Sequence, residues 1–230
     1  MQKTVEIALA GTKLSIRNRQ LVIERPDHTP ASLPVEDIGM IILDNGQTRY
    51  TQSVMVNLME AGAVILLSGT DHLPLGMMLP FNSYHAVTKR QIAQTQSKAS
   101  LKKRLWQQLV KSKIEGQARL LTHMNQSDHG LNKLAAKVRS GDPENVEAWA
   151  AQIYWPALFG KNFRRDRKEP NINALLNYGY AIIRASCARY LVASGMNPTL
   201  GVFHSNRSNP FCLADDMLEH FSKSGYRFCV

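Results

Sequence analysis

Residues 200–219 combine one histidine with three closely spaced carboxylates. His204 follows an expected turn, and Asp215, Asp216 and Glu219 lie on the helix expected after it. Glu219 is four residues from Asp215 and three from Asp216, so carboxylates can share one helix face. Because unpaired acids on one face repel one another, we expect a cation among them. A metal ion and basic side chains from elsewhere in the chain are both candidates.

A fourth acid occurs in an apolar setting upstream. Glu147 lies in an expected helix whose neighbouring side chains are Ala148, Ala150, Ala151, Ile153, Tyr154 and Trp155. A carboxylate buried in such surroundings must be paired or must bind a ligand. A first-turn acid that complements the helix dipole is an equally good interpretation. The pattern alone leaves both open.

Glu147, His204 and one or two of the downstream acids form a candidate site with oxygen and nitrogen ligands. Carboxylates with a single imidazole suit Mg²⁺ or Mn²⁺ better than zinc, whose sites usually carry more nitrogen or sulfur. Such an ion beside a basic surface is typical of phosphodiester chemistry. On spacing alone, however, a histidine followed by acids is more often a capping or hydrogen-bonded surface group.

The net charge of +10 is concentrated in the middle of the chain. Residues 1–82 carry −2, residues 83–168 carry +11, and residues 169–230 carry +1. This distribution favours nucleic acid as a partner, because phosphate contacts dominate nucleic-acid affinity. A solvated helix surface that aids solubility is the alternative. The best candidates for phosphate contacts form one basic loop: Lys161, Arg164, Arg165, Arg167 and Lys168.

The pattern of short apolar runs predicts an α+β protein with a β-rich N-terminal domain. Strands are expected at residues 5–9, 13–16, 20–24, 38–43 and 64–67, with one helix at residues 53–61. The domains are predicted to be a β-rich packing or dimerisation domain (1–80), a linker (81–88) and a helical domain (89–230).

The helical domain should position the candidate ligands. Residues 88–124 predict one long helix or two abutting ones, with Trp106 in the core rather than stacking on bases. Asp142-Pro143 and Asn209-Pro210 predict helix starts, because asparagine and aspartate cap helices and proline suits the first turn. A long helix is expected from Ile172 to Ser194.

Several classes are disfavoured by what the sequence lacks. It contains no P-loop, dinucleotide-binding glycine fingerprint or nucleophile elbow. No apolar run is long enough to span a bilayer, and the first residues do not resemble a signal peptide. Three cysteines without paired spacing argue against a disulfide framework or a zinc ribbon. We therefore expect a cytoplasmic protein.

Three blocks resemble the CRISPR-associated protein one family, the adaptation integrases. The first is residues 33–44 followed by residues 58–67. The second is Glu147 in its alanine-rich helix. The third runs from residues 171–180 through Leu200-Gly-Val-Phe-His204 to Leu213-Ala-Asp-Asp-Met-Leu-Glu219. The resemblance spans nearly the whole chain, and the type II branch looks most similar.

The resemblance implies a site and an activity. Glu147, His204 and Glu219 take the family's metal-ligand positions, and Asp216 matches a further family aspartate. The implied activity is Mg²⁺- or Mn²⁺-dependent DNA nicking and strand transfer, in which a 3′-hydroxyl of a short DNA attacks a CRISPR repeat. The implied assembly is a homodimer through the β domains, bridged to a second one by the small CRISPR-associated protein two.

The sequence departs from the family after Glu219. The usual Pro-Phe-Arg-Pro is replaced by residues 220–223, His-Phe-Ser-Lys, and relatives continue into further helices where this chain stops. We expect a C-terminally shortened relative. Two other functions stay open: a non-catalytic DNA-binding scaffold and a repair nuclease that acts on branched DNA.

Overall fold

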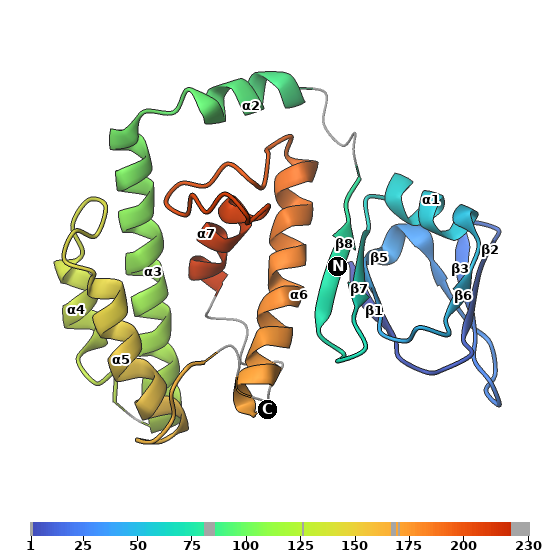
Figure 1. The fold of residues 1–230 in the computed structure, drawn as a ribbon, viewed down its shortest axis with the longest axis horizontal. Helices are drawn as coiled ribbons and strands as arrows, with labels where there is room; N and C mark the ends of the chain where they lie inside the picture. Colours follow the sequence, from blue (N-terminus) through green and yellow to red (C-terminus); the bar gives the residue numbers. More distant parts are fainter. Residues whose placement is uncertain (1, 81–85, 126, 167–168, 170, 222–230) are drawn as a thin grey trace. The chain divides into compact units, whose positions relative to one another are not determined.

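The computed structural model describes residues 2–80, 86–125, 127–166, 169 and 171–221. The chain divides into two units (Figure 1). Unit 1 combines residues 1–88 with Ala185–Met196, and unit 2 combines Lys89–Arg184 with Asn197–Val230. The β-rich N-terminal region and the helical C-terminal region confirm the predicted α+β class.

Unit 1 contains two four-stranded sheets. The first has the order β1 (Lys3–Ile7), β5 (Ile38–Leu43), β7 (Val64–Ser68), β8 (Pro74–Met78). Its first three strands are parallel, and β8 is antiparallel to β7. Every residue of β5 is buried, which matches its unbroken apolar sequence, since a strand covered on both faces needs no alternation.

The second sheet has the order β4 (Ala31–Pro34), β3 (Gln20–Glu24), β2 (Lys13–Arg17), β6 (Arg49–Tyr50). Asn18 and Arg19, both with positive φ, form the two-residue turn between β2 and β3, as the twist of a tight hairpin requires. A short 3₁₀ helix, η1 (Val35–Asp37), and helix α1 (Gln52–Glu60) complete this part of the unit. Their apolar side chains share one core with both sheets.

Unit 2 is built around the longest helix, α3 (Ala99–Asn125), which contacts α4, α5 and α7. The other helices are α2 (Val87–Thr95), α4 (Leu131–Lys137), α5 (Val146–Phe159), the first part of α6 (Ile172–Ala193), and α7 (Cys212–Phe221). Trp106, Val110, Ile114 and Leu121 follow one face of α3 and are fully buried. Trp106 is therefore a core residue, as predicted. None of the helices within the described residues is long and apolar enough to cross a membrane.

The helix boundaries refine the sequence prediction. Residues 88–124 form two helices, α2 and α3, one of the two predicted possibilities. The predicted start at Asp142-Pro143 is wrong, because Asn145 takes a left-handed conformation and α5 begins only at Val146. Similarly, α7 begins at Cys212 rather than at Asn209-Pro210.

The C-terminal part of α6 belongs with the strands rather than with the helical unit. Ala185, Cys187 and Ala188 are buried, and Arg189 hydrogen-bonds to the carbonyl oxygen of Gly62 and to the side chain of Gln2. The contiguous helical domain predicted for residues 89–230 is therefore interrupted by Ala185–Met196. Of the predicted linker, residues 81–85 lie outside the described residues.

Candidate metal and DNA site

The loop Gly201–His204 is wrapped around the carboxylate of Asp216. Asp216 lies on α7 and is completely buried. Its Oδ2 accepts the backbone N–H groups of Val202 (2.5 Å) and Phe203 (3.0 Å). Its Oδ1 accepts the backbone N–H of His204 (3.2 Å) and contacts His204 Nδ1 at 2.7 Å. Four hydrogen bonds thus compensate the burial of this charge.

The contact with Asp216 sets the orientation of the His204 imidazole. A carboxylate at Nδ1 favours the tautomer with its proton on that nitrogen, and that tautomer presents its lone pair on Nε2. Metal-binding histidines are commonly fixed in this way by a carboxylate behind the ring. The His204 side chain is 42% exposed. Asp216 therefore supports His204 from behind.

Aromatic side chains hold the same loop against α3. The Phe203 ring stacks on the buried Trp106 ring, with centroids 4.2 Å apart and an angle of 5° between the planes. The His204 ring lies edge-on to both rings. Its centroid is 5.7 Å from that of Trp106 and 5.8 Å from that of Phe203. The imidazole is thus fixed by ring packing as well as by Asp216.

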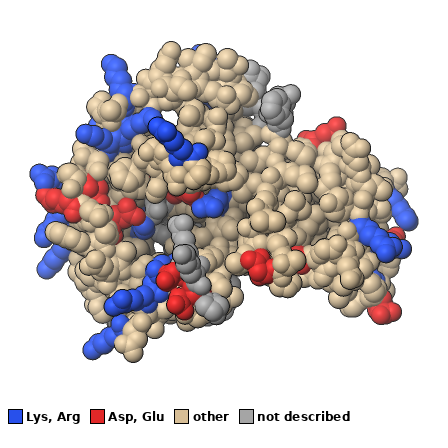
Figure 2. Space-filling model, viewed as in Figure 1, with Lys and Arg blue, Asp and Glu red and all other residues tan. Residues whose placement is uncertain are grey.

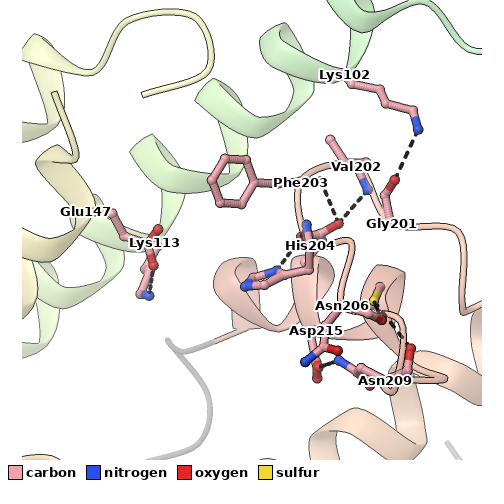
Figure 3. Close-up of polar contacts among 12 residues, drawn as sticks. Lys102, Lys113, Glu147, Gly201, Val202, Phe203, His204, Asn206, Asn209 and Asp215 are labelled. Atoms are coloured by element: carbon pink, nitrogen blue, oxygen red, sulfur yellow. Dashed lines mark hydrogen bonds and ion pairs between the residues drawn. The ribbon is translucent and has the colours of Figure 1, made fainter. Parts of the chain in front are cut away.

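Close approach of the backbone makes glycine necessary at position 201. A Cβ there would overlap the carbonyl oxygen of His204 and lie 3.0 Å from Asp216 Oδ2. Lys102 of α3 also donates to the Gly201 carbonyl at 3.4 Å (Figure 3). Any larger residue would force the loop away from the carboxylate that organises it.

Glu147 lies in the first turn of α5 and faces α3. Asp142 precedes the helix, and its two carboxylate oxygens accept the N–H groups of Val146 (2.9 Å) and Glu147 (3.0 Å). The Glu147 carboxylate itself contacts Lys113 of α3, with 2.6 Å between Nζ and Oε1 (Figure 3). Both interpretations offered by the sequence therefore hold: Glu147 is a first-turn acid of α5, and its carboxylate is paired with Lys113.

Asp215, whose role the sequence left open, connects two helices. Its Oδ1 accepts a hydrogen bond from Arg184 Nε of α6 at 2.6 Å. Its Oδ2 accepts one from Asn209 Nδ2 at 2.7 Å. The cation expected beside the acids of residues 215–219 is thus, for Asp215, a basic side chain of the same protein.

Helix α3 is the common support of the two candidate ligands. Trp106 contacts the His204 ring, and Lys113 contacts Glu147. These residues of α3 are seven apart, so they lie on one helix face about 10 Å apart along the axis. The sequence predicted helix over residues 88–124 and a positive charge in this region, but it gave no signal that Lys113 in particular would meet Glu147.

The donor chemistry fits a hard divalent ion. Glu147 offers carboxylate oxygens, and the Asp216-supported imidazole of His204 is of the kind that binds metals. Gln117, one turn beyond Lys113 on α3, also has a buried Oε1 without a hydrogen-bond partner among the described residues. The third candidate, Glu219, lies in α7, but its side chain is outside the described residues. Within the described part of the chain, no three acidic, histidine or cysteine side chains converge.

The basic loop predicted to contact phosphates is anchored to α6. Arg165 donates to Asn173 Oδ1 (3.1 Å) and Asn177 Oδ1 (2.8 Å), and its guanidinium lies 5.6 Å from the centre of the Tyr180 ring. Lys161 and Arg164 are exposed. Arg167 and Lys168 lie outside the described residues.

The buried Asn173 organises this loop. Its Oδ1 accepts the backbone N–H of Asp166 (3.0 Å) besides the Arg165 guanidinium, and its Nδ2 donates to the Arg164 carbonyl oxygen (3.1 Å). The side-chain oxygens of Asn173 and Asn177 both accept a hydrogen bond from Arg165.

Comparison with known proteins identifies the family. The sequence profile described as "CRISPR associated protein Cas1" matches residues 6–224. The chain belongs to the Cas1 family. The "CRISPR-associated endonuclease Cas1" of Neisseria meningitidis is 43% identical over 91% of this chain and 69% of that relative. The "CRISPR-associated endonuclease Cas1 2" of Pyrobaculum aerophilum is 24% identical over 94% of this chain and 78% of that relative.

Solved structures share the Cas1 fold at low sequence identity. A Cas1 protein from Thermotoga maritima has a TM-score of 0.74 at 16% identity, with 96% of this chain and 75% of that one covered. A casposase bound to its integration product has a TM-score of 0.77 at 20% identity, with 96% of this chain and 69% of that one covered. The predicted resemblance to the adaptation integrases is therefore confirmed at the level of family and fold.

Proposed function

We propose that this protein is a divalent-metal-dependent DNA endonuclease and strand transferase of CRISPR spacer acquisition. Its membership of the Cas1 family supports this function, as does its 43% identity to a relative named as a CRISPR-associated endonuclease. The main structural support for this function is the arrangement at His204. A buried carboxylate behind Nδ1 at 2.7 Å is the arrangement that prepares an imidazole to bind a metal.

Glu147, His204 and Glu219 would hold the Mg²⁺ or Mn²⁺ ion. The bound ion supplies Lewis acidity at a phosphate oxygen and charge stabilisation at the leaving oxygen. Asp216 keeps the imidazole in one tautomer, and the stacked rings of Trp106 and Phe203 keep it in one place. The capping contacts of Asp142 fix the backbone from which Glu147 projects.

DNA is the proposed substrate: a short captured DNA with 3′-hydroxyl ends and a CRISPR repeat that receives it. Lys and Arg side chains gather in several groups over the helical part of the chain, with acidic side chains between some of them (Figure 2). Among the predicted phosphate contacts, the exposed Lys161 and Arg164 are the best placed, because Arg165 is already bound to Asn173 and Asn177.

The proposed partners are a second copy of this chain and the small Cas2 protein. A related solved assembly, named as a Cas6-RT-Cas1–Cas2 complex, has a TM-score of 0.73 at 20% identity. A casposase structure of the same fold contains an integration product. These solved structures support the proposal that this chain too handles DNA together with a Cas2 partner.

The test measures cleavage of branched DNA and joining of 3′-hydroxyl ends to a repeat duplex with Mn²⁺. The wild type should form both products, and Glu147→Gln, His204→Ala and Glu219→Gln should each lower the rates by at least 100-fold. Removing a metal ligand has this effect because the transition-state charge loses its stabilisation. The Glu169→Gln variant serves as a control outside the site and should keep full activity.

Two results would contradict the proposal. Undiminished activity in His204→Ala would remove His204 from the site. Salt-sensitive DNA binding by the wild type without any Mn²⁺-dependent product would instead favour a non-catalytic DNA-binding scaffold.

A further inference from the structure

Lys113 forms an ion pair with Glu147, which is a candidate ligand of the metal site. The paired atoms are 2.6 Å apart, and the two side chains are only 15% and 23% exposed. Surface ion pairs contribute little because water screens them, whereas a largely buried pair interacts strongly. This contact is therefore more than an incidental encounter of two surface side chains.

The backbone on both sides of this ion pair is fixed. Lys113 precedes the buried Ile114 on the central helix α3, and the start of α5 is held by the two backbone hydrogen bonds that Val146 and Glu147 donate to Asp142. Neither helix can withdraw without breaking core contacts. A change of partner at Glu147 must therefore come from side-chain rotation, and Lys113 has the longer side chain of the two.

A divalent ion and an ammonium group compete for one carboxylate. An ion bound by Glu147 would lie within a few ångströms of the present position of Lys113 Nζ, and two cations at that distance repel. The partial burial of the pair makes this repulsion stronger than at an open surface. Metal binding to Glu147 therefore favours movement of the ammonium away from this carboxylate.

We propose that Lys113 is an exchangeable counter-ion of the metal site: it neutralises Glu147 in the metal-free protein and is released when the divalent ion binds. This inference rests on the proposed function, because it takes Glu147 as a metal ligand. It gives the protein a stable site before metal arrives, at the expense of metal affinity. Lys113 thereby becomes a positioning residue that acts through Glu147.

The experiment measures Mn²⁺ binding to the full chain by electron paramagnetic resonance, without DNA. Lys113→Met removes the competing charge and should bind Mn²⁺ about 3- to 10-fold more tightly than the wild type. Lys111→Met, on the same helix, loses the same charge without touching Glu147 and should bind within about 2-fold of the wild type. In a protein that also carries Glu147→Gln, replacing Lys113 by Met should no longer change the Mn²⁺ affinity.

Thermal melting provides a second readout. In EDTA, Lys113→Met should melt below the wild type because Glu147 is left without its partner, and Mn²⁺ should raise its melting temperature by more than it raises that of the wild type. Should Lys113→Met fail to fold, Lys113→Gln retains a hydrogen-bond donor for Glu147 and is measured in its place.

The outcomes separate this inference from the proposed function. Equal or weaker Mn²⁺ binding by the Lys113 variant, with measurable binding by the wild type, would overturn the exchange at Lys113 and leave the proposed function standing. Absence of Mn²⁺ binding by every protein, the wild type included, would overturn both. Tighter Mn²⁺ binding by Lys113→Met, together with no DNA cleavage by the wild type, would support the exchange and contradict only the proposed nuclease activity.

Discussion

At the scale of single residues, the site depends on a carboxylate that is positioned away from solvent. Asp216 was expected to be a possible additional ligand, but both of its oxygens are taken by the loop 202–204. The sequence could predict that these acids belong together, because their spacing places them on one helix. It could not predict which of them turns inward, because that depends on the loop folding back over α7.

We predict that Asp216→Asn uncouples the loop from α7. An amide can present only one oxygen, so its NH₂ group would face N–H donors and leave buried hydrogen bonds unmade. Mn²⁺ affinity should fall by about 10- to 100-fold, the usual effect of losing a carboxylate behind a ligating histidine. Nitrogen-15 NMR of the imidazole should also show a mixture of tautomers.

The control for this substitution is Asp215→Asn. It removes the same charge from the neighbouring position and weakens the contact with Arg184, but it leaves the His204 tautomer unchanged. An unaltered tautomer in Asp216→Asn would show that Asp216 does not orient the ring.

At the scale of elements, the basic loop before α6 is held in place by one buried amide. Asn173 bonds to Arg165, Asp166 and Arg164 through its side chain. The loop therefore presents its exposed cations from a fixed backbone. For a surface that recognises phosphates, this preorganisation reduces the entropy lost on binding.

We predict that Asn173→Ala destabilises unit 2 and weakens DNA binding together. The loss of the amide leaves its buried hydrogen-bond partners unsatisfied. This should lower the free energy of unfolding by about 2–3 kcal/mol, measured by urea denaturation. Asn162→Ala, at an exposed position of the same loop, should change stability by less than about 0.5 kcal/mol. Equal DNA affinity of the two variants would show that the order of this loop does not contribute to DNA binding.

The elements best predicted from the sequence are those with a long or unambiguous pattern. The bounds of β3 and β5 agree with the prediction, and those of α6 differ by one residue. The strands β4, β6 and β8 were missed: β6 has two residues, β4 ends in a proline, and β8 begins with one and contains Gly76. Proline is tolerated in β8 because this strand is at the edge of its sheet.

The site was predicted less completely than the fold, for a physical reason. His204 and Glu147 carry recognisable chemistry, so residue type and the resemblance to a family marked them as candidates. Lys113 and Asn173 act through contacts across 34 and 9 residues of chain. Such contacts arise from helix packing, which a local pattern does not encode.

At the scale of the whole molecule, the charge is divided unevenly. Residues 83–168 carry a net charge of +11 and belong almost entirely to unit 2. Electrostatic attraction to DNA should therefore arise from the helical unit. The first 82 residues, with a net charge of −2, contribute little to it.

We predict that Lys161→Ala combined with Arg164→Ala reduces the salt dependence of DNA binding. Each phosphate contact contributes about 0.9 to the slope of log affinity against log salt concentration, so the slope should fall by about 2. Arg25→Ala combined with Arg49→Ala removes two exposed arginines from unit 1 and should leave the slope unchanged. Fluorescence anisotropy at several salt concentrations measures both, and equal slopes would exclude the loop as a phosphate contact.

Because Arg189 bonds to Gly62 and Gln2, unit 1 can be completed only after α6 has been synthesised. During synthesis, the strands of unit 1 leave the ribosome first, but Ala185–Met196 follows about a hundred residues later. Until then the strands lack the buried face of α6, while unit 2 begins to form from the intervening residues. Closing so long a loop adds only a modest entropy cost. The nascent N-terminal unit is therefore incomplete until its last helix has been made.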